Sequence, residues 1–118
     1  MALSVDSQIQ TMTTFRLDLR SSGQTVTVSP GDRLELKLEE NPTTGFRWHI
    51  DDDRNGVLIL EHDAFTHLHD GLSGAGGTRE FMFTIAKSGQ ATLRASYRRS
   101  WERQKPAKTA FELTVSSK

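Results

Sequence analysis

Hydrophobic and polar residues alternate with a period of two along most of this chain. In residues 33–39, leucines at positions 34, 36 and 38 are separated by charged residues. Such alternation is typical of strands with one buried face, because successive side chains of a strand point to opposite sides. No window has a convincing helical period of 3.6 residues. The predicted strands span residues 14–19, 25–28, 33–39, 46–51, 57–66, 78–86, 90–98 and 109–116.

Turn-forming residues separate these segments, as at Ser22-Gly23, Asn55-Gly56 and Ser88-Gly89. About eight short strands with regular turns predict an all-β fold, an antiparallel sandwich or barrel. The chain has 118 residues and no linker, repeat or low-complexity tract, so we expect one domain over 1–118 with its folded core over about 13–116. The continuous apolar run 57–60 predicts a buried strand that continues towards Phe65.

Three unusual connections are expected at one end of the sandwich, because alternate connections share an end when consecutive strands are antiparallel. They are a first loop (residues 41–45, NPTTG), a second loop (67–77, HLHDGLSGAGG) and a third loop (99–108, RSWERQKPAK). The connections expected at the other end, 52–56 and 87–89, are shorter and plainer. Function is usually located in loops on a rigid scaffold, so the three-loop end is the candidate binding site.

The first loop is a polar turn placed before a well-anchored strand. Pro42 fixes its φ and Gly45 can adopt a positive φ. Phe46, Trp48 and Ile50 then alternate with polar residues, as in a half-buried strand. A binding loop has this construction, and so does an ordinary hairpin. Trp101 in the third loop has the same ambiguity, since it could bind a partner or fold back onto the sandwich.

Composition excludes several classes of function. Fifteen basic residues balance fifteen acidic ones, which predicts no binding to nucleic acid or anionic membranes. The absence of cysteine excludes disulfides, thiolate metal sites and a cysteine nucleophile. The first ten residues, MALSVDSQIQ, lack the features of a secretory signal, so the protein is expected in the cytoplasm, or in the periplasm or outside the cell if a leader was removed. No long apolar surface pattern demands a dimer, and a monomer is expected.

The histidines form a rival site. His62, His67 and His69 lie close to Asp63 and Asp70, and imidazoles with a carboxylate can bind zinc. His62 has the opposite strand parity and no fourth ligand is evident, so solvated histidines are the preferred interpretation and no metal or cofactor is expected.

Catalysis has no support in the pattern of residues. No Ser–His–acid arrangement stands out, and the chain is not expected to be an enzyme. Paired acids such as Glu39-Glu40 are expected at strand-end surfaces, and His49 is expected to face solvent or a sheet edge.

Three motifs in order carry a family resemblance: NPTTGF at 41–46, GAGG at 74–77, and Arg99-Ser100-Trp101 after a strand that ends near Tyr97. The chain resembles the chagasin family, proteinaceous inhibitors of papain-like cysteine proteases, over roughly residues 13–116. The family's third motif usually has proline where this chain has Ser100. Serine leaves φ less constrained, which predicts a less preorganised loop and weaker or differently selective binding.

The resemblance implies an immunoglobulin-like fold whose three loops enter a protease's active-site cleft and block it reversibly. It implies that Thr43 approaches the catalytic cysteine, that Thr44 and Gly45 shape the first loop, and that the second-loop glycines bring backbone close to the cleft wall. Trp101 would pack on the primed side, with Arg99 supporting the loop or the contact. The implied protease-binding residues are Asn41, Pro42, Thr43, Thr44, Gly45, Phe46, Gly74, Ala75, Gly76, Gly77, Arg99, Ser100 and Trp101.

An alternative stays open at this point. An immunoglobulin-like adhesion or ligand-binding module would use the same loop end for a different partner. The sequence does not name the target protease.

Overall fold

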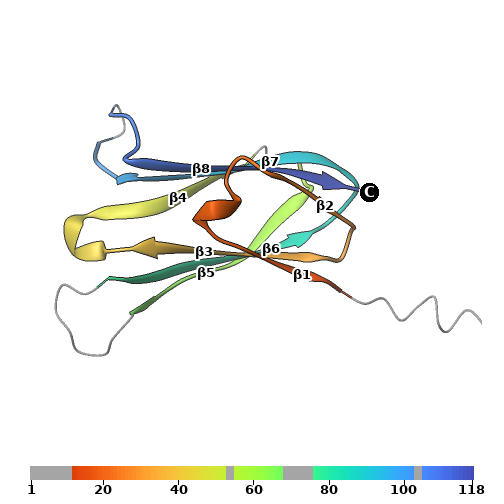
Figure 1. Cartoon of the computed structure of the whole chain (residues 1–118), viewed down its shortest axis with the longest axis horizontal. Coiled ribbons are helices and arrows are strands. Elements are labelled where there is room, and N and C mark those ends of the chain that lie inside the picture. The colour runs from red at the N-terminus through yellow and green to blue at the C-terminus, as the bar shows by residue number, and fades with distance from the viewer. Residues whose placement is uncertain (1–11, 53–54, 68–75, 103–104) are drawn as a thin grey trace, which may run out of the picture.

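Two facing β-sheets of four strands each make up the protein (Figure 1). This computed structural model describes residues 12–52, 55–67, 76–102 and 105–118. The first sheet has the order β1-β3-β6-β5 and the second β2-β8-β7-β4. The predicted all-β sandwich is therefore confirmed. The strands are β1 Thr14–Leu17, β2 Thr25–Val28, β3 Arg33–Glu40, β4 Phe46–Asp52, β5 Leu58–His67, β6 Gly77–Ile85, β7 Gly89–Arg99 and β8 Thr109–Ser117.

The inner strands pair antiparallel, but the two short edge strands do not. β1 runs parallel to β3 and β2 runs parallel to β8. Both strands have four residues, and the chain crosses from one sheet to the other between them. Each sheet therefore gains a short edge strand from one continuous passage of the chain.

The first strand is shorter than predicted, because it ends at Leu17 and not at Leu19. Asp18 caps the 3-10 helix η1 (Leu19–Ser21), and its carboxylate accepts a hydrogen bond from the Arg20 N–H at 2.9 Å. The Ser21 hydroxyl in turn accepts one from the Asp18 N–H at 3.2 Å. Short polar side chains thus satisfy the backbone locally, in competition with a continued strand ladder.

The alternating hydrophobic residues form the core between the sheets, as their parity predicts. Leu34, Phe83 and Leu93 have no exposed surface. The complete set of buried hydrophobic residues is Val28, Leu34, Leu36, Leu38, Trp48, Val57, Leu58, Phe81, Phe83, Ile85, Ala91, Leu93, Ala95, Phe111, Leu113 and Val115. None of the described helices is long and apolar enough to span a membrane.

The prediction that residues 57–60 are buried throughout is wrong for its second half. Val57 and Leu58 are buried, but Ile59 and Leu60 are 43% and 42% exposed. β5 is an edge strand, and its register with β6 shifts between Leu60 and His62. In the described part of the chain, the outer face of this sheet has no second layer and β5 has no neighbouring strand on its outer side, so its apolar run is covered only in part.

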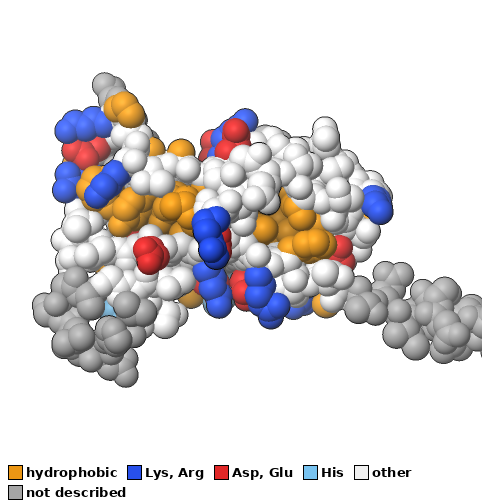
Figure 2. Space-filling view, in the orientation of Figure 1, with side chains coloured by type: hydrophobic (Ala, Val, Ile, Leu, Met, Phe, Trp, Pro, Cys, Tyr) orange, Lys and Arg blue, Asp and Glu red, His pale blue; other side chains and the backbone are white. Residues whose placement is uncertain are grey.

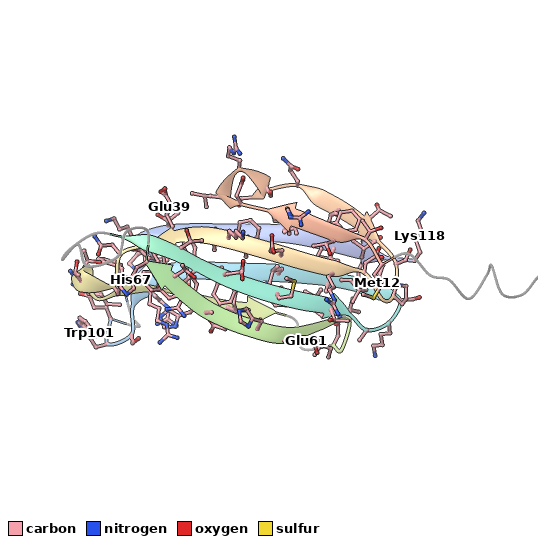
Figure 3. The ribbon with its side chains drawn as sticks, turned by 90° about the horizontal axis from the view of Figure 1, so that it is seen from below. Met12, Glu39, Glu61, His67, Trp101 and Lys118 are labelled. Atoms are coloured by element: carbon pink, nitrogen blue, oxygen red, sulfur yellow. The ribbon has the colours of Figure 1, made fainter. Side chains whose placement is uncertain are left out.

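The strand ends that bound the three loops lie at the same end of the sandwich, as predicted (Figure 1). Glu40, at the end of β3, pairs with Gly77 at the start of β6. Gly77 also pairs with His67, and Phe46 pairs with Arg99 in the other sheet. These pairs place the bases of the first, second and third loops beside one another. In Figure 3, Trp101 and His67 lie at this end, whereas Met12 and Lys118 lie at the opposite one.

Candidate functional site

The first loop folds into a capped 3-10 turn, η2 (Pro42–Thr44). The Asn41 side-chain oxygen accepts hydrogen bonds from the Thr43 N–H at 3.2 Å and from the Thr43 hydroxyl at 2.7 Å. Gly45 ends the turn with φ of 81°, a left-handed conformation that favours glycine. Asparagine, proline and glycine thus each occupy the position that their chemistry suits.

Further hydrogen bonds close the first loop on itself. The Thr44 hydroxyl donates to the Asn41 carbonyl at 2.7 Å and accepts from the Phe46 N–H at 3.3 Å. The Asn41 N–H donates to the hydroxyl of Tyr97, in the facing strand β7, at 3.0 Å. The loop is therefore held in shape by its own residues and by the sheet beneath it, while Thr43 at its tip is exposed.

The third loop contacts the first directly. The Arg99 Nε donates to the Thr44 carbonyl at 3.0 Å, and its guanidinium carbon lies 4.5 Å from the centre of the Phe46 ring. A Cβ atom added to Gly45 would lie 2.6 Å from Cη2 of Trp101, so the indole packs against this glycine. The two loops consequently present one continuous surface.

Trp101 is 71% exposed although it touches Gly45. It does not fold back into a covered satellite cluster, which was one interpretation of its sequence. Exposed tryptophan is typical of binding surfaces, because its large apolar area becomes useful only when a partner covers it. The turn that carries it is closed by a hydrogen bond from the Glu102 N–H to the Arg99 carbonyl at 3.0 Å, with Ser100 at its second position.

Stacked aromatic rings support both loops from below. The rings of Trp48 and Tyr97 stack with centroids 5.0 Å apart, and the Phe46 ring lies 5.4 Å from that of Tyr97. The indole N–H of Trp48 donates to the Glu39 carbonyl at 2.8 Å. This stack joins the second sheet to β3 directly beneath the first loop.

Of the second loop, the structure describes only His67, Gly76 and Gly77. Gly74 and Ala75, which the sequence also suggested, lie outside the described residues. Gly77 is buried, and a Cβ there would overlap the Thr66 carbonyl oxygen. A Cβ at Gly76 would come within 3.2 Å of the Glu40 carbonyl oxygen. Both glycines thus permit close contacts within this chain.

Glu40 is the residue at this end that sequence reasoning misplaced. It was expected at a strand-end surface, but its side chain is only 1% exposed. One carboxylate oxygen accepts from the Trp48 N–H at 2.9 Å, and the other from Arg79 Nη2 at 2.7 Å. Arg79 also donates to Asp63 at 3.0 Å. The group links β3, β4, β5 and β6 at the bases of the loops. The available signal was parity, since Glu40 continues the inward series of three leucines.

Of the histidines in the rival zinc site, the structure describes His62 and His67. His62 lies 3.8 Å from Glu80, and the His67 ring packs edge-on against Phe65. Among the described residues, no group of three or more His, Cys, Asp or Glu side chains could hold a metal ion. His69 and Asp70 are outside the described residues.

His49 lies on the edge strand β4, which is one of its two predicted positions, but it is half-buried and its Nε2 is inaccessible without a hydrogen-bond partner. Burial lowers the pKa of His49, and the positive charges of Arg98 and Arg47 lower that pKa further. The imidazole is thus held in its neutral form by its surroundings.

Comparison with known proteins identifies the relatives of this fold. Residues 27–115 match the chagasin family of peptidase inhibitors, I42. Chagasin of Trypanosoma cruzi is 32% identical over 84 residues, which cover 68% of this chain and 76% of chagasin. The cysteine protease inhibitor EhICP2 of Entamoeba histolytica has a TM-score of 0.84 at 25% identity, over 92% of this chain and 99% of that chain. PbICP-C, solved in complex with falcipain-2, shares the fold with a TM-score of 0.63 at 17% identity, over 90% and 99% of the two chains.

Proposed function

Because the chain belongs to the chagasin family of peptidase inhibitors, we propose that it inhibits papain-like cysteine proteases by filling their active-site cleft with its three loops. The main observation that supports this mechanism is the direct contact between the first and third loops. Arg99 bonds to Thr44 and Trp101 packs on Gly45, so the loops act as one rigid wedge. The relatives are inhibitors, and the chain is accordingly not an enzyme.

Rigidity favours binding because little conformational entropy remains to be lost when the protease engages the loops. Four residues of the first loop maintain its turn through internal hydrogen bonds or backbone geometry: Asn41, Pro42, Thr44 and Gly45. Thr43, at the exposed tip, is the residue proposed to approach the catalytic cysteine. These roles separate the residues that shape the wedge from the one that reaches the target.

Trp101 and Arg99 are proposed to supply binding energy beside this tip. Tryptophan and arginine are the residue types most enriched at interface hot spots. Trp101 would pack on the primed side of the cleft, and Arg99 would hold both loops together through Thr44 and Phe46. Ser100 lies between them in the same exposed turn. The third loop therefore combines a contact residue with its support.

In the second loop, the glycines divide between two roles. Gly76 and Gly77 serve the junction of this loop with β3 and β5, where a side chain at Gly77 would collide with backbone and one at Gly76 would make a tight contact with it. Gly74 and Ala75 are proposed, from the family resemblance, to bring backbone close to the protease.

The geometry of the first loop also accounts for resistance to cleavage by the bound protease. Proteases cleave extended backbone, whereas residues 42–44 form a 3-10 turn closed by hydrogen bonds. Opening that turn would break the bonds of Asn41 and Thr44 before any peptide could be cleaved. We expect tight, reversible inhibition, and progressive cleavage with recovery of protease activity would contradict it.

The test is a titration of papain and of a cathepsin L-like protease with the purified protein. Stoichiometric loss of activity supports the proposal, whereas an adhesion or ligand-binding module would leave both enzymes active. Thr43→Arg should abolish inhibition, because a long charged side chain at the tip cannot enter the cleft. Thr27→Arg is the matched control, since Thr27 is exposed on β2 and far from the loops in the sandwich. If both variants inhibit like the wild type, the loop assignment is wrong.

A further inference from the structure

Positive charge is concentrated on the segments that carry the first and third loops. Among the described residues in 41–49 and 96–108, Glu102 is the only carboxylate. The chain as a whole carries equal numbers of acidic and basic residues, so this concentration is local. Figure 2 shows basic side chains gathered around an acidic one at the end where the third loop lies. The cations among the described residues of these segments are Arg47, Arg98, Arg99, Lys105 and Lys108.

Two of these cations face each other across neighbouring strands. Arg47 of β4 is the direct register partner of Arg98 of β7. Neither has a carboxylate within ion-pair distance in the described part of the chain. Like charges directly opposite in a sheet destabilise it. His49, two residues along β4 from Arg47 and opposite Ser96, supplies no negative charge to offset the pair. The fold alone does not account for this pair.

The remaining cations are only partly neutralised. Glu102 lies 3.5 Å from Arg99 and 2.9 Å from Lys105, so one carboxylate serves two cations. Lys108 has its ammonium 5.0 Å from the centre of the Phe46 ring, and no ion pair with a described carboxylate. Phe46 and Arg47 are consecutive in β4, so the Phe46 ring under Lys108 and the Arg47–Arg98 pair face opposite sides of the sheet. We call Arg47 and Arg98 the basic surface.

We propose that the basic surface meets an acidic area bordering the cleft of the target protease and accelerates association with it. This inference rests on the proposed inhibitory function and adds the charge of the partner. Arg47 lies two residues beyond the first loop, and Arg98 immediately precedes the third. When a protease binds the loops in its cleft, the rim of the cleft would come close to the basic surface, within the ~8 Å over which charges interact at physiological salt.

A protein partner fits this surface better than a polyanion does. Domains that bind nucleic acid through phosphates usually have a strongly basic overall charge, and this chain has a calculated pI near 6.9. Two neighbouring cations beside a binding wedge are suited to steering one complementary protein surface, because complementary charge mainly raises the association rate.

The experiment measures association and dissociation rates of Arg47→Gln/Arg98→Gln by stopped flow. Two papain-like proteases are used, whose cleft rims carry opposite net charge. For the acidic-rimmed protease at low salt we expect about a tenfold slower association, the lower range of electrostatic steering. The dissociation rate should change less than twofold, and the salt dependence of association should flatten. Association with the basic-rimmed protease should stay the same or become faster.

Arg33→Gln/Lys87→Gln is the matched control, because it removes the same charge from exposed positions at the other end of the sandwich. Equal effects of the two double variants, or salt-independent association of the wild type, would overturn the proposal. Thermal melting should show no loss of stability in Arg47→Gln/Arg98→Gln, since a repulsive pair has been removed.

Two other outcomes are distinguishable. Binding of the wild type to anionic phosphatidylglycerol vesicles, lost in Arg47→Gln/Arg98→Gln, would assign the basic surface to membranes and overturn the proposal. If the wild type inhibits neither protease, the proposed function fails and this inference fails with it. If the variant inhibits normally and its association and dissociation rates are unaltered, the proposed role of the basic surface is refuted and the inhibitory function is retained.

Discussion

The indole ring of Trp101 occupies the space that a side chain at Gly45 would need. A Cβ there would lie 2.6 Å from Cη2 and 3.3 Å from Cζ2 of the ring. Gly45 also has φ of 81°. Gly45 therefore serves two purposes. It allows the left-handed conformation at the end of the first loop, and its lack of a side chain leaves room for the Trp101 ring of the third loop.

Gly45→Ala should weaken protease inhibition at least tenfold by displacing Trp101 from its seat, a loss of about 1.4 kcal/mol or more. Gly31→Ala is the control, because Gly31 has φ of 97° but nothing within 4 Å of an added Cβ. Both variants should lose about 1–2 kcal/mol of unfolding free energy through left-handed strain. Only Gly45→Ala should lose inhibition, measured as the inhibition constant against papain.

A double-mutant cycle with Trp101→Ala tests the contact itself. If the ring and the glycine are coupled, Gly45→Ala should cost little further inhibition once the indole is absent. Additive losses would show that Gly45 acts through backbone conformation alone.

Ser100→Pro should stabilise the third loop and strengthen inhibition. Ser100 is the second residue of the hydrogen-bonded turn from Arg99 to Glu102, where proline's fixed φ is favoured. A compatible proline typically contributes about 0.4–1 kcal/mol by restricting the unfolded chain. Thermal melting and the inhibition constant are the measurements. Ser100→Ala is the control and should have neither effect, and a proline variant that binds more weakly would show that the turn must move.

Glu40→Ala should destabilise the protein by about 3–5 kcal/mol, because it leaves the partly buried Arg79 guanidinium without its main partner. Glu39→Ala is a control from the adjacent position: its side chain is exposed, and Trp48 uses only its backbone carbonyl. We expect a change within about 0.5 kcal/mol there. Urea unfolding of the two variants gives both values, and similar midpoints would contradict the structural role of Glu40.

His49 should make stability depend on pH below about 6.5, its ordinary pKa. Burial, then Arg98 and Arg47, lower the pKa of His49 in the folded state. The unfolded chain therefore binds more protons over this range, so stability is highest above pH 6.5 and decreases as pH falls towards the folded pKa.

Replacing His49 by Gln should flatten this dependence. Unfolding free energies between pH 7.5 and 5, a range of about two and a half units around the ordinary histidine pKa, provide the test. An unaltered slope in His49→Gln would assign the pH dependence to other groups.

The sequence determined the strands, most of the core and the grouping of the loops. These features follow from local rules, since strand periodicity decides which side chains face inward and turn residues decide where each strand stops. Leu34, Leu36 and Leu38 were placed correctly for this reason. So was the capped turn of residues 41–45, because Asn41, Pro42 and Gly45 act on backbone within a few residues of themselves.

The tertiary structure alone decided how distant residues combine. The parallel edge strands, the burial of Glu40 against Arg79, and the collision that makes Gly77 necessary all depend on strands far apart in the sequence. The seat of Trp101 on Gly45 is of the same kind. No local pattern encodes such contacts, because each depends on the register and separation of two elements that only folding brings together.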